Sequence, residues 1–280
     1  MNKKNFDLNR FGKLVKHDLA TLWPTFGPTM LIIVLLPMTI WLSVLVLGHH
    51  LNIESIPPVV RLMLICFSVV LVGIMAPSRI YRYANIRKDG IYFAMLPASK
   101  LEKFVSMLLM IMVVCPIVAL IGGLLVDMFF TLLPFGPYRT SIWNMADSLH
   151  ELFNFGDDYE AYYYFGRYLT PANVIVSSIG EYLANVALFL FTSTIFKRHK
   201  VLFTILALYA IEFVLTLIAT PIIVTHFMEL STSGLVDTWV RNYDPDLILQ
   251  NIYYWGHATN IIFFVGLTLW SGLRLKKMRY

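Results

Sequence analysis

The chain has 280 residues, of which 58% are hydrophobic and 14% are charged, and its formal net charge is +5. A soluble domain carries about 25% charged residues, so the composition excludes an ordinary soluble protein and indicates a membrane protein. The positive charge does not indicate nucleic-acid binding, because 18 of the 22 Lys and Arg residues flank long apolar runs, where positive charge reports membrane topology.

The N-terminal arm, residues 1–27, has the pattern of an amphipathic helix. Arg10, Lys13 and Lys16 fall opposite an apolar face. The residues of that face recur at spacings of three and four: Leu8, Phe11, Val15, Leu19 and Leu22. A basic amphipathic helix lies in the membrane interface. We therefore expect the arm to be a cytoplasmic surface helix, acting either as an anchor or as a docking element for a soluble partner.

Six apolar runs follow the arm, each of roughly 17–24 residues, which is enough for a helix to cross the hydrocarbon core. Helices satisfy their backbone groups internally, as a segment in lipid must. The sequence therefore predicts an all-α polytopic membrane protein with six transmembrane helices. Their predicted ranges are 30–47, 59–75, 104–125, 174–196, 201–224 and 259–275.

Several residues within these spans indicate bends or close packing. Pro37, Pro116 and Pro221 interrupt the first, third and fifth spans. Proline lacks a backbone N–H and clashes with the preceding turn, so these helices should bend. Gly123 and Gly266 are small enough to allow close contact between helices.

Positive charge is concentrated on one side of the spans. It lies in the arm and in segments 78–103, 197–200 and 274–279, which together carry 18 basic and 4 acidic residues. Cytoplasmic segments of membrane proteins are enriched in Lys and Arg. We therefore expect both termini to be cytoplasmic, with outer loops at 126–173 and 225–258. The inner surface then suits anionic lipid or an acidic partner.

The cytoplasmic loop at 78–103 mixes basic and apolar residues, and it ends at a clear helix start. Ser99 precedes Glu102 by three residues, which is the spacing of a capping box. We therefore expect short surface helices in this loop and a third transmembrane helix that begins at Ser99. The apolar residues of the loop either insert among the headgroups or form a surface for a soluble partner.

The two outer loops are long. The 126–173 loop is rich in acidic and aromatic residues, and aromatic side chains are enriched at the headgroup level, so we expect an interfacial helix there. The 225–258 loop contains short apolar stretches. These predict one or two short helices against the outer face.

Two carboxylates lie inside predicted spans, where an ionisable group is costly and is a functional-site hypothesis by default. Glu181 lies about 24 Å from Lys197 along its helix, and Arg61 lies about 27 Å from Arg79. These similar depths predict an ion pair between Arg61 and Glu181. Glu212 has no basic residue at its depth. We expect it to be protonated, bonded to a hydroxyl side chain, or facing a polar cavity or a subunit interface.

Motifs of enzymes and of metal sites are absent from the sequence. It has no Gly-rich phosphate loop ending in Lys-Ser or Lys-Thr, so the chain is not expected to hydrolyse ATP by itself. It has no His-Glu-x-x-His or Gly-x-Ser-x-Gly motif. Its seven His residues form no cluster with ligand spacing. The sequence therefore predicts neither an enzyme nor a bound cofactor or metal.

This arrangement resembles the permease subunit of a type-2 ABC exporter. The likeness in topology covers most of the chain: six spans, both ends inside, an amphipathic N-terminal helix and a helical cytoplasmic loop after the second span. Within that loop, Asp89-Gly90, Leu96-Pro97-Ala98-Ser99 and Lys103 are similar to the acidic-Gly, Leu-Pro-small-Ser and Lys pattern of such permeases. Two features depart from the family: the long 126–173 segment, and the absence of glutamates in residues 85–88.

The resemblance implies a function and a set of partners. Residues 1–280 would form a single transmembrane domain in the bacterial cytoplasmic (inner) membrane. The domain would work with a separate ABC ATPase subunit and pair with a second permease copy or a paralogue. The 78–103 loop would dock on the ATPase, with the coupling residues Ile91, Tyr92, Phe93, Met95, Leu96, Pro97 and Ser99. The arm would be the interfacial connecting helix.

Two other functions remain open at this point. A secondary carrier or channel would use Glu181 or Glu212 as a proton or cation site. It should also show an inverted repeat, and none is visible between spans one to three and spans four to six. A non-transporting scaffold or sensor would use the aromatic, acidic outer loop as its binding face and would need no ATPase.

Overall fold

The computed structural model describes residues 6–51, 56–80, 95–133, 171–196, 199–232 and 245–277. Every regular element in these ranges is a helix, as the sequence predicts. The elements are α1 (Leu8–Val34), α2 (Leu36–Leu51), α3 (Pro58–Ile80), α5 (Lys100–Leu109), the π-helical turn η2 (Met110–Val114), α6 (Cys115–Thr131), α9 (Pro171–Ile195), α10 (Lys200–Thr232) and α12 (Pro245–Lys277).

Five helical segments in the described part of the chain are long and apolar enough to cross a membrane, which indicates an integral membrane protein. They are Leu8–Leu47, Pro58–Ile80, Lys100–Thr131, Ala172–Ile195 and Lys200–Ile218. The predicted sixth span lies within α12, which is not among the five.

The helices on the predicted outer side are longer than the sequence suggested. The third span continues to Thr131, so Asp127 lies in α6 and not in an outer loop. α10 continues to Thr232 and α12 begins at Pro245, so these two helices take up both ends of the 225–258 segment. Residues 233–244, where the first of the short helices is expected, lie outside the described residues. Residues 134–170, with the expected interfacial helix, lie outside the described residues.

The three prolines have different effects on their helices. Leu35 separates α1 from α2, two residues before Pro37. The π-helical turn η2 ends two residues before Pro116, and such a turn accommodates a position that cannot donate a backbone hydrogen bond. Pro221, by contrast, lies inside α10 without interrupting it.

The arm forms one continuous helix with the beginning of the first span, and its buried face coincides only in part with the apolar face predicted. The buried side chains recur every four residues: Leu14, Asp18, Leu22, Phe26 and Met30. Leu8, on the predicted face, is 77% exposed. On the predicted face, Leu8 and Leu19 are exposed, Phe11 and Val15 are half-buried and Leu22 is buried. The buried stripe, which contains Asp18, therefore overlaps the predicted face only in part.

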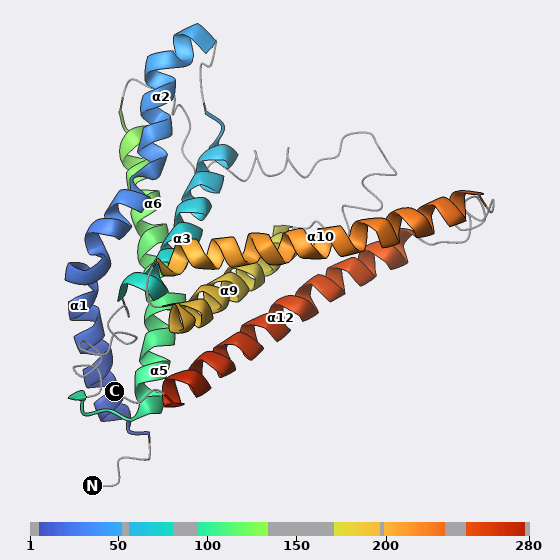
Figure 1. Ribbon diagram of the computed structural model, residues 1–280. Coiled ribbons are helices and arrows are strands. Elements are labelled where there is room, and N and C mark those ends of the chain that lie inside the picture. Colours follow the sequence, from blue (N-terminus) through green and yellow to red (C-terminus); the bar gives the residue numbers. More distant parts are fainter. Residues whose placement is uncertain are drawn as a thin grey trace.

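The helices form two groups that diverge from a common region (Figure 1). The first group contains α1, α2, α3 and the continuous α5–η2–α6 segment. The second contains α9, α10 and α12, which lean away from the first. At the contact between the groups, α9 crosses α3, where Tyr182 packs against Gly73 so closely that a Cβ on that glycine would lie 2.8 Å from the tyrosine hydroxyl.

Specific contacts show the relative directions of the helices. Arg61 and Ile65 of α3 meet Asp127 and Gly123 of α6, respectively, so these two helices run antiparallel. In the second group, Gly180 of α9 packs near Asn260 of α12, and Phe191 stacks near Trp270, so α9 and α12 run parallel.

The far end of α12 reaches the beginning of α5. A Cβ on Gly272 would lie 3.1 Å from the ring of Phe104. The first turns of α1 also lie at this end, where they contact α5 (Figure 1). The N-terminal end of α1 and the C-terminal end of α12 therefore meet the start of α5 on the same side of the molecule.

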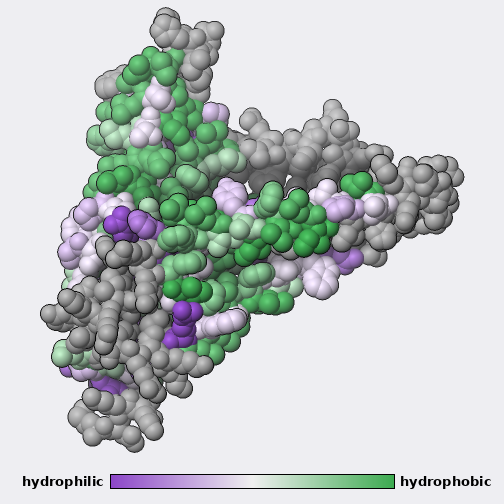
Figure 2. Space-filling view, in the orientation of Figure 1, coloured by the Kyte–Doolittle hydropathy of each residue, from purple (hydrophilic) through white to green (hydrophobic). Residues whose placement is uncertain are grey.

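Much of the described surface is apolar, as Figure 2 shows by the green colour over α2 and α10. Large apolar side chains are exposed along most of α10, including Phe213, Leu217 and Ile218. In water such a surface would drive aggregation, whereas lipid accommodates it. The distribution therefore agrees with a membrane protein.

The Gly123 contact can be tested by adding a single methyl group. In Gly123→Ala the new Cβ would lie 2.8 Å from Cγ2 of Ile65, and such overpacking costs about 1–3 kcal/mol of the free energy of unfolding. Gly266→Ala is the control, because nothing lies within 4 Å of its Cβ position. We expect thermal unfolding in detergent to show a lower Tm for the first variant only. An unchanged Tm for Gly123→Ala would contradict the close α3–α6 contact.

Candidate functional site

The predicted capping box is present at the start of α5. The backbone N–H of Glu102 donates to Oγ of Ser99 at 3.2 Å, and the backbone N–H of Ser99 donates to Oε2 of Glu102 at 2.7 Å. These two bonds satisfy donors that would otherwise lack partners at a helix N-terminus. They also hold the end of the preceding segment, Leu96-Pro97-Ala98-Ser99, against α5.

The same carboxylate binds the beginning of α1, which the sequence did not reveal. Oε1 of Glu102 accepts from the backbone N–H of Asp7 at 2.9 Å and from Nη2 of Arg10 at 3.1 Å. The Glu102 side chain is fully buried. A buried carboxylate is stable only when it is paired and hydrogen-bonded, and Glu102 receives both kinds of contact from two separate segments.

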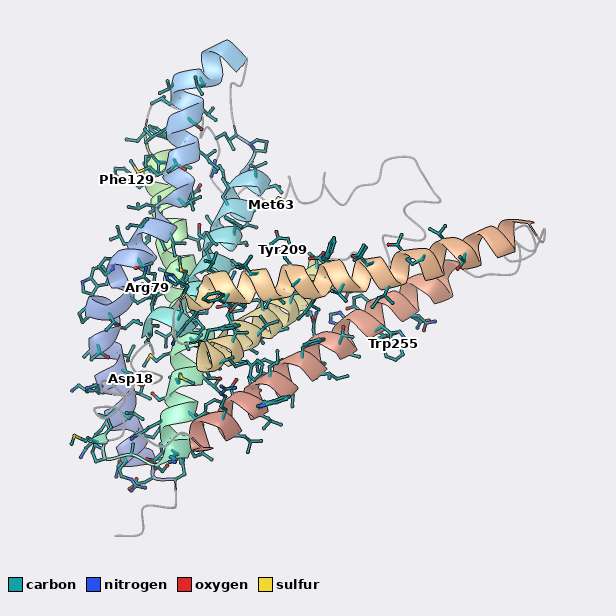
Figure 3. The ribbon with its side chains drawn as sticks, in the orientation of Figure 1. Asp18, Met63, Arg79, Phe129, Tyr209 and Trp255 are labelled. Atoms are coloured by element: carbon teal, nitrogen blue, oxygen red, sulfur yellow. The ribbon has the colours of Figure 1, made fainter. Side chains whose placement is uncertain are left out.

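A second polar contact joins α1 to α5, about two turns further along α1 and one turn further along α5. Oγ of Ser106 donates to Oδ2 of Asp18 at 2.6 Å, and both residues are buried. Figure 3 shows Asp18 in the lower half of α1, beside α5. Asp7, Arg10, Asp18, Ser99, Glu102 and Ser106 together form what we call the arm clasp.

Four of the residues predicted to couple to a partner lie next to this clasp. Met95 is 74% exposed, Pro97 is exposed and Leu96 is half-buried. Ser99 belongs to the clasp itself. Ile91, Tyr92 and Phe93 lie outside the described residues. The described part of the segment thus presents an exposed apolar side chain directly before a fixed helix start.

The predicted ion pair between Arg61 and Glu181 is wrong. Arg61 instead binds Asp127 through two parallel contacts, from Nε to Oδ1 at 3.0 Å and from Nη2 to Oδ2 at 2.8 Å. Both side chains are buried. A bidentate geometry of this kind is the strongest form of a guanidinium–carboxylate pair.

A helical signal in the sequence could have identified this partner. Arg61 and Ile65 are four residues apart on α3, and Gly123 and Asp127 are four residues apart on α6. Such pairs lie on one helix face, so two antiparallel helices bring them into register. The signal was missed because Asp127 was placed in a loop beyond the third span.

Glu181 and Glu212 occupy exposed positions on α9 and α10, respectively. The structure therefore does not bury either carboxylate in the way it buries Glu102 and Asp127. Among the described residues, no three His, Cys, Asp or Glu side chains lie close enough together to hold a metal ion.

The Arg61–Asp127 pair should be essential for stability. Asp127→Ala leaves the buried guanidinium without this partner, which costs about 3–5 kcal/mol of the free energy of unfolding. Glu181→Ala is the matched control, and a substitution at such an exposed site changes stability by about 0.5 kcal/mol or less. Denaturant unfolding in mixed micelles can rank the two variants. If Glu181→Ala proves equally damaging, the assigned pairing is incorrect.

The arm clasp can be tested through the mobility of α1. Glu102→Gln keeps the shape of the side chain but weakens the contacts to Asp7 and Arg10, because the charge is lost. We expect backbone hydrogen exchange in the first turns of α1 to rise several-fold. Ser99→Ala removes only the helix cap, at a cost of about 1 kcal/mol, and should accelerate exchange mainly at the start of α5. Equal effects on α1 would show that Glu102 does not hold the arm.

Comparison with family models, curated proteins and solved structures found no match for this chain. A functional assignment therefore depends on the residues and on their geometry.

Proposed function

We propose that this chain is the membrane-spanning permease subunit of an ATP-driven ABC-type exporter. It has six transmembrane helices with both termini in the cytoplasm, and it resides in the bacterial inner membrane. A separate ATPase subunit docks on the cytoplasmic 78–103 loop, and a second permease copy or a paralogue completes the transport path.

The observation that carries this proposal is the arm clasp. A permease driven by a soluble ATPase needs a docking segment that moves its transmembrane helices. The segment ending at Ser99 is held to α5 by the capping box, and Glu102 holds α5 to the first turn of α1. A displacement of the docking segment would therefore move two helices together, because the bonds that join them are charge-assisted and converge on one buried carboxylate.

The directions of the helices support six spans with both termini on one side. Six alternating spans require the fourth and sixth to run in the same direction, and α9 and α12 run parallel. They also require the sixth to end where the third begins, and Gly272 of α12 contacts Phe104 near the start of α5. The excess of Lys and Arg assigns that side to the cytoplasm.

The carrier alternative has less support. A carboxylate that binds a transported proton or cation should face the interior of the bundle or a water-filled cavity. Glu181 and Glu212 occupy exposed faces of two different helices. The other alternative, a scaffold that works without an ATPase, is distinguished by the following experiment, which measures whether an ATPase copurifies with the chain.

Met95→Glu should release the ATPase without unfolding the protein. Met95 is 74% exposed, so the charge is tolerated in the isolated chain but would be buried in an apolar contact with the partner. We expect about tenfold less ATPase to copurify with the tagged chain from native membranes, because burying an unpaired charge costs more than about 1.4 kcal/mol. Mass spectrometry of the eluate measures the amount of ATPase recovered.

Leu8→Glu is the matched control, because Leu8 is also an exposed apolar residue on the same side of the protein but outside the docking segment. It should retain the ATPase. Recovery of the wild-type chain without a protein carrying a phosphate-binding loop, under conditions that preserve a known ABC complex, would favour the scaffold. Equal ATPase recovery with Met95→Glu and the wild type would disprove the coupling role of this segment.

A further inference from the structure

The first and third spans run side by side in a fixed register. Ser106 of α5 donates to Asp18 of α1, and a Cβ on Gly122 of α6 would lie 3.0 Å from Cγ1 of Val34. Val34 lies sixteen residues beyond Asp18, and Gly122 lies sixteen residues beyond Ser106. Positions at equal distances beyond Asp18 and Ser106 therefore lie at the same level, one on each helix.

Both helices carry a proline at one such level. Pro28 lies ten residues beyond Asp18, and Pro116 lies ten residues beyond Ser106. Each proline withholds an amide donor from the carbonyl one turn before it and clashes with that turn. The π-helical turn η2 ends just before Pro116, and such turns are a common cause of kinks. The two helices therefore have weak points at matching positions.

The turn of α1 before Pro28 is weakened further. Pro24 also lies inside α1, so a second amide hydrogen bond is missing there. Oγ1 of Thr25 donates to the backbone oxygen of Thr21 at 2.6 Å. A threonine hydroxyl bonded to the carbonyl one turn back tends to bend a helix. This part of α1 is therefore easier to bend than an ordinary helix.

Helix α3 has its own weak point at the same level. It runs antiparallel to α6, and Ile65 meets Gly123. Gly73 is eight residues further along α3, and Cys115 is eight residues back from Gly123, so Gly73 lies beside the start of α6. Pro77 follows one turn later, at the level of η2. Glycine and proline are the residues of lowest helix propensity, so α3 also bends most easily here.

The polar contacts between these helices lie on either side of this level. On the inner side, the arm clasp joins α1 to α5. On the outer side, the buried Arg61–Asp127 pair joins α3 to α6. Charge-assisted contacts have a defined geometry and hold each side together, whereas apolar packing between residues such as Phe26, Val72 and Ile111 fills the level itself. Apolar contacts are non-directional, so they permit movement between the two sides.

The second helix group meets the first at this level. Tyr182 and Val186 of α9 lie 2.8 and 2.9 Å from the Cβ position of Gly73, and Figure 1 shows α9 reaching the first group near the junction of α5 and α6. The Tyr182 hydroxyl is buried, and it has no hydrogen-bond partner among the described residues. A buried hydroxyl without a partner is costly. This contact therefore does not favour the described arrangement over one in which the helices have shifted.

We propose that α1, α3 and the α5–η2–α6 segment bend together at the level of Pro28, Gly73 and Pro116. The inner part of the first group, which includes the arm clasp, then tilts as one unit relative to the outer part. A bend of about 20° over the twelve residues between Lys16 and Pro28, about 18 Å, displaces the arm by about 6 Å. The bend itself requires no ATPase. In the proposed function, a docked ATPase would act on the inner unit.

Spin-label distances in the full-length chain, reconstituted in lipid nanodiscs, test the bend. Cys66→Ser removes the exposed thiol, and the buried Cys115 is retained. Lys16→Cys combined with Met63→Cys places one label on the inner part and one on the outer part, both at exposed positions. Pulsed electron paramagnetic resonance measures the distribution of distances between the two labels.

Two control pairs lie within the inner part and within the outer part. They are Lys16→Cys with Leu101→Cys, and Met63→Cys with Met128→Cys, again at exposed positions. We expect the inner–outer pair to give a distribution several ångströms broader than either control pair. Equal widths for all three pairs would overturn the proposal, and this comparison needs no proline variant.

Replacing the prolines should stiffen the bend. Pro28→Ala and Pro116→Ala each restore an amide donor, so the double variant should narrow the inner–outer distribution to the width of the control pairs. Pro221→Ala is the matched control, because this proline lies in α10, outside the first group, and it should leave the distribution unchanged. An unaltered distribution in the double variant, or equal narrowing by Pro221→Ala, would rule out the bend.

Thermal unfolding of the chain with its native cysteines is a second measurement, which needs no label. If the helices bend as a unit, the changes in Tm caused by Pro28→Ala and Pro116→Ala should not add, because straightening one helix is opposed by the other. The changes caused by Pro28→Ala and Pro221→Ala should add, as they do for independent sites. Additive changes for the first pair would contradict a joint bend.

All of these measurements use the chain without an ATPase. A rigid first group would therefore contradict this inference alone, whereas the absence of a copurifying ATPase would contradict the proposed function alone.

Discussion

The carboxylate of Glu102 is the interaction on which the junction between α1 and α5 depends. It closes the capping box at the start of α5 and accepts hydrogen bonds from Asp7 and Arg10 at the start of α1. One buried charge thereby determines where the third transmembrane helix begins and where the N-terminal arm is held. A buried charge is costly without partners, so the loss of any contact to Glu102 weakens the positioning of both helix ends. This dependence makes this end of the molecule suitable for transmitting a displacement.

The predicted outer half of the first helix group depends on a different kind of contact. Arg61 and Asp127 form a buried bidentate pair, and one turn away Ile65 packs against Gly123. The glycine allows α3 and α6 to approach closely, and this approach brings the two charges within bonding distance. Polar pairing and close packing thus stabilise the same pair of helices. A buried hydrogen bond, from Ser106 to Asp18, likewise joins α5 to α1.

The second helix group distributes its polar residues differently. On α9 and α10, Glu181 and Glu212 lie on exposed surfaces, whereas the carboxylates of the first group are paired inside the protein. The first group is therefore stabilised by buried polar contacts of its own. On α10, an exposed carboxyl group is flanked by hydroxyl groups on one face of a long apolar helix.

Local chemistry alone determined several features of this protein. Apolar runs long enough to span specified membrane helices, and the Ser99–Glu102 spacing specified a helix start, because both depend on residues close together in the chain. The contacts of α1 with Glu102 and the pairing of Arg61 with Asp127 were decided only by the tertiary structure. Each joins segments more than 60 residues apart, and depth along separate helices does not show which helices are neighbours. The full buried face of α1 is not visible in the sequence for the same reason: its stripe includes Asp18, and the hydrogen bond from Ser106, 88 residues away, is one contact that makes a buried aspartate acceptable.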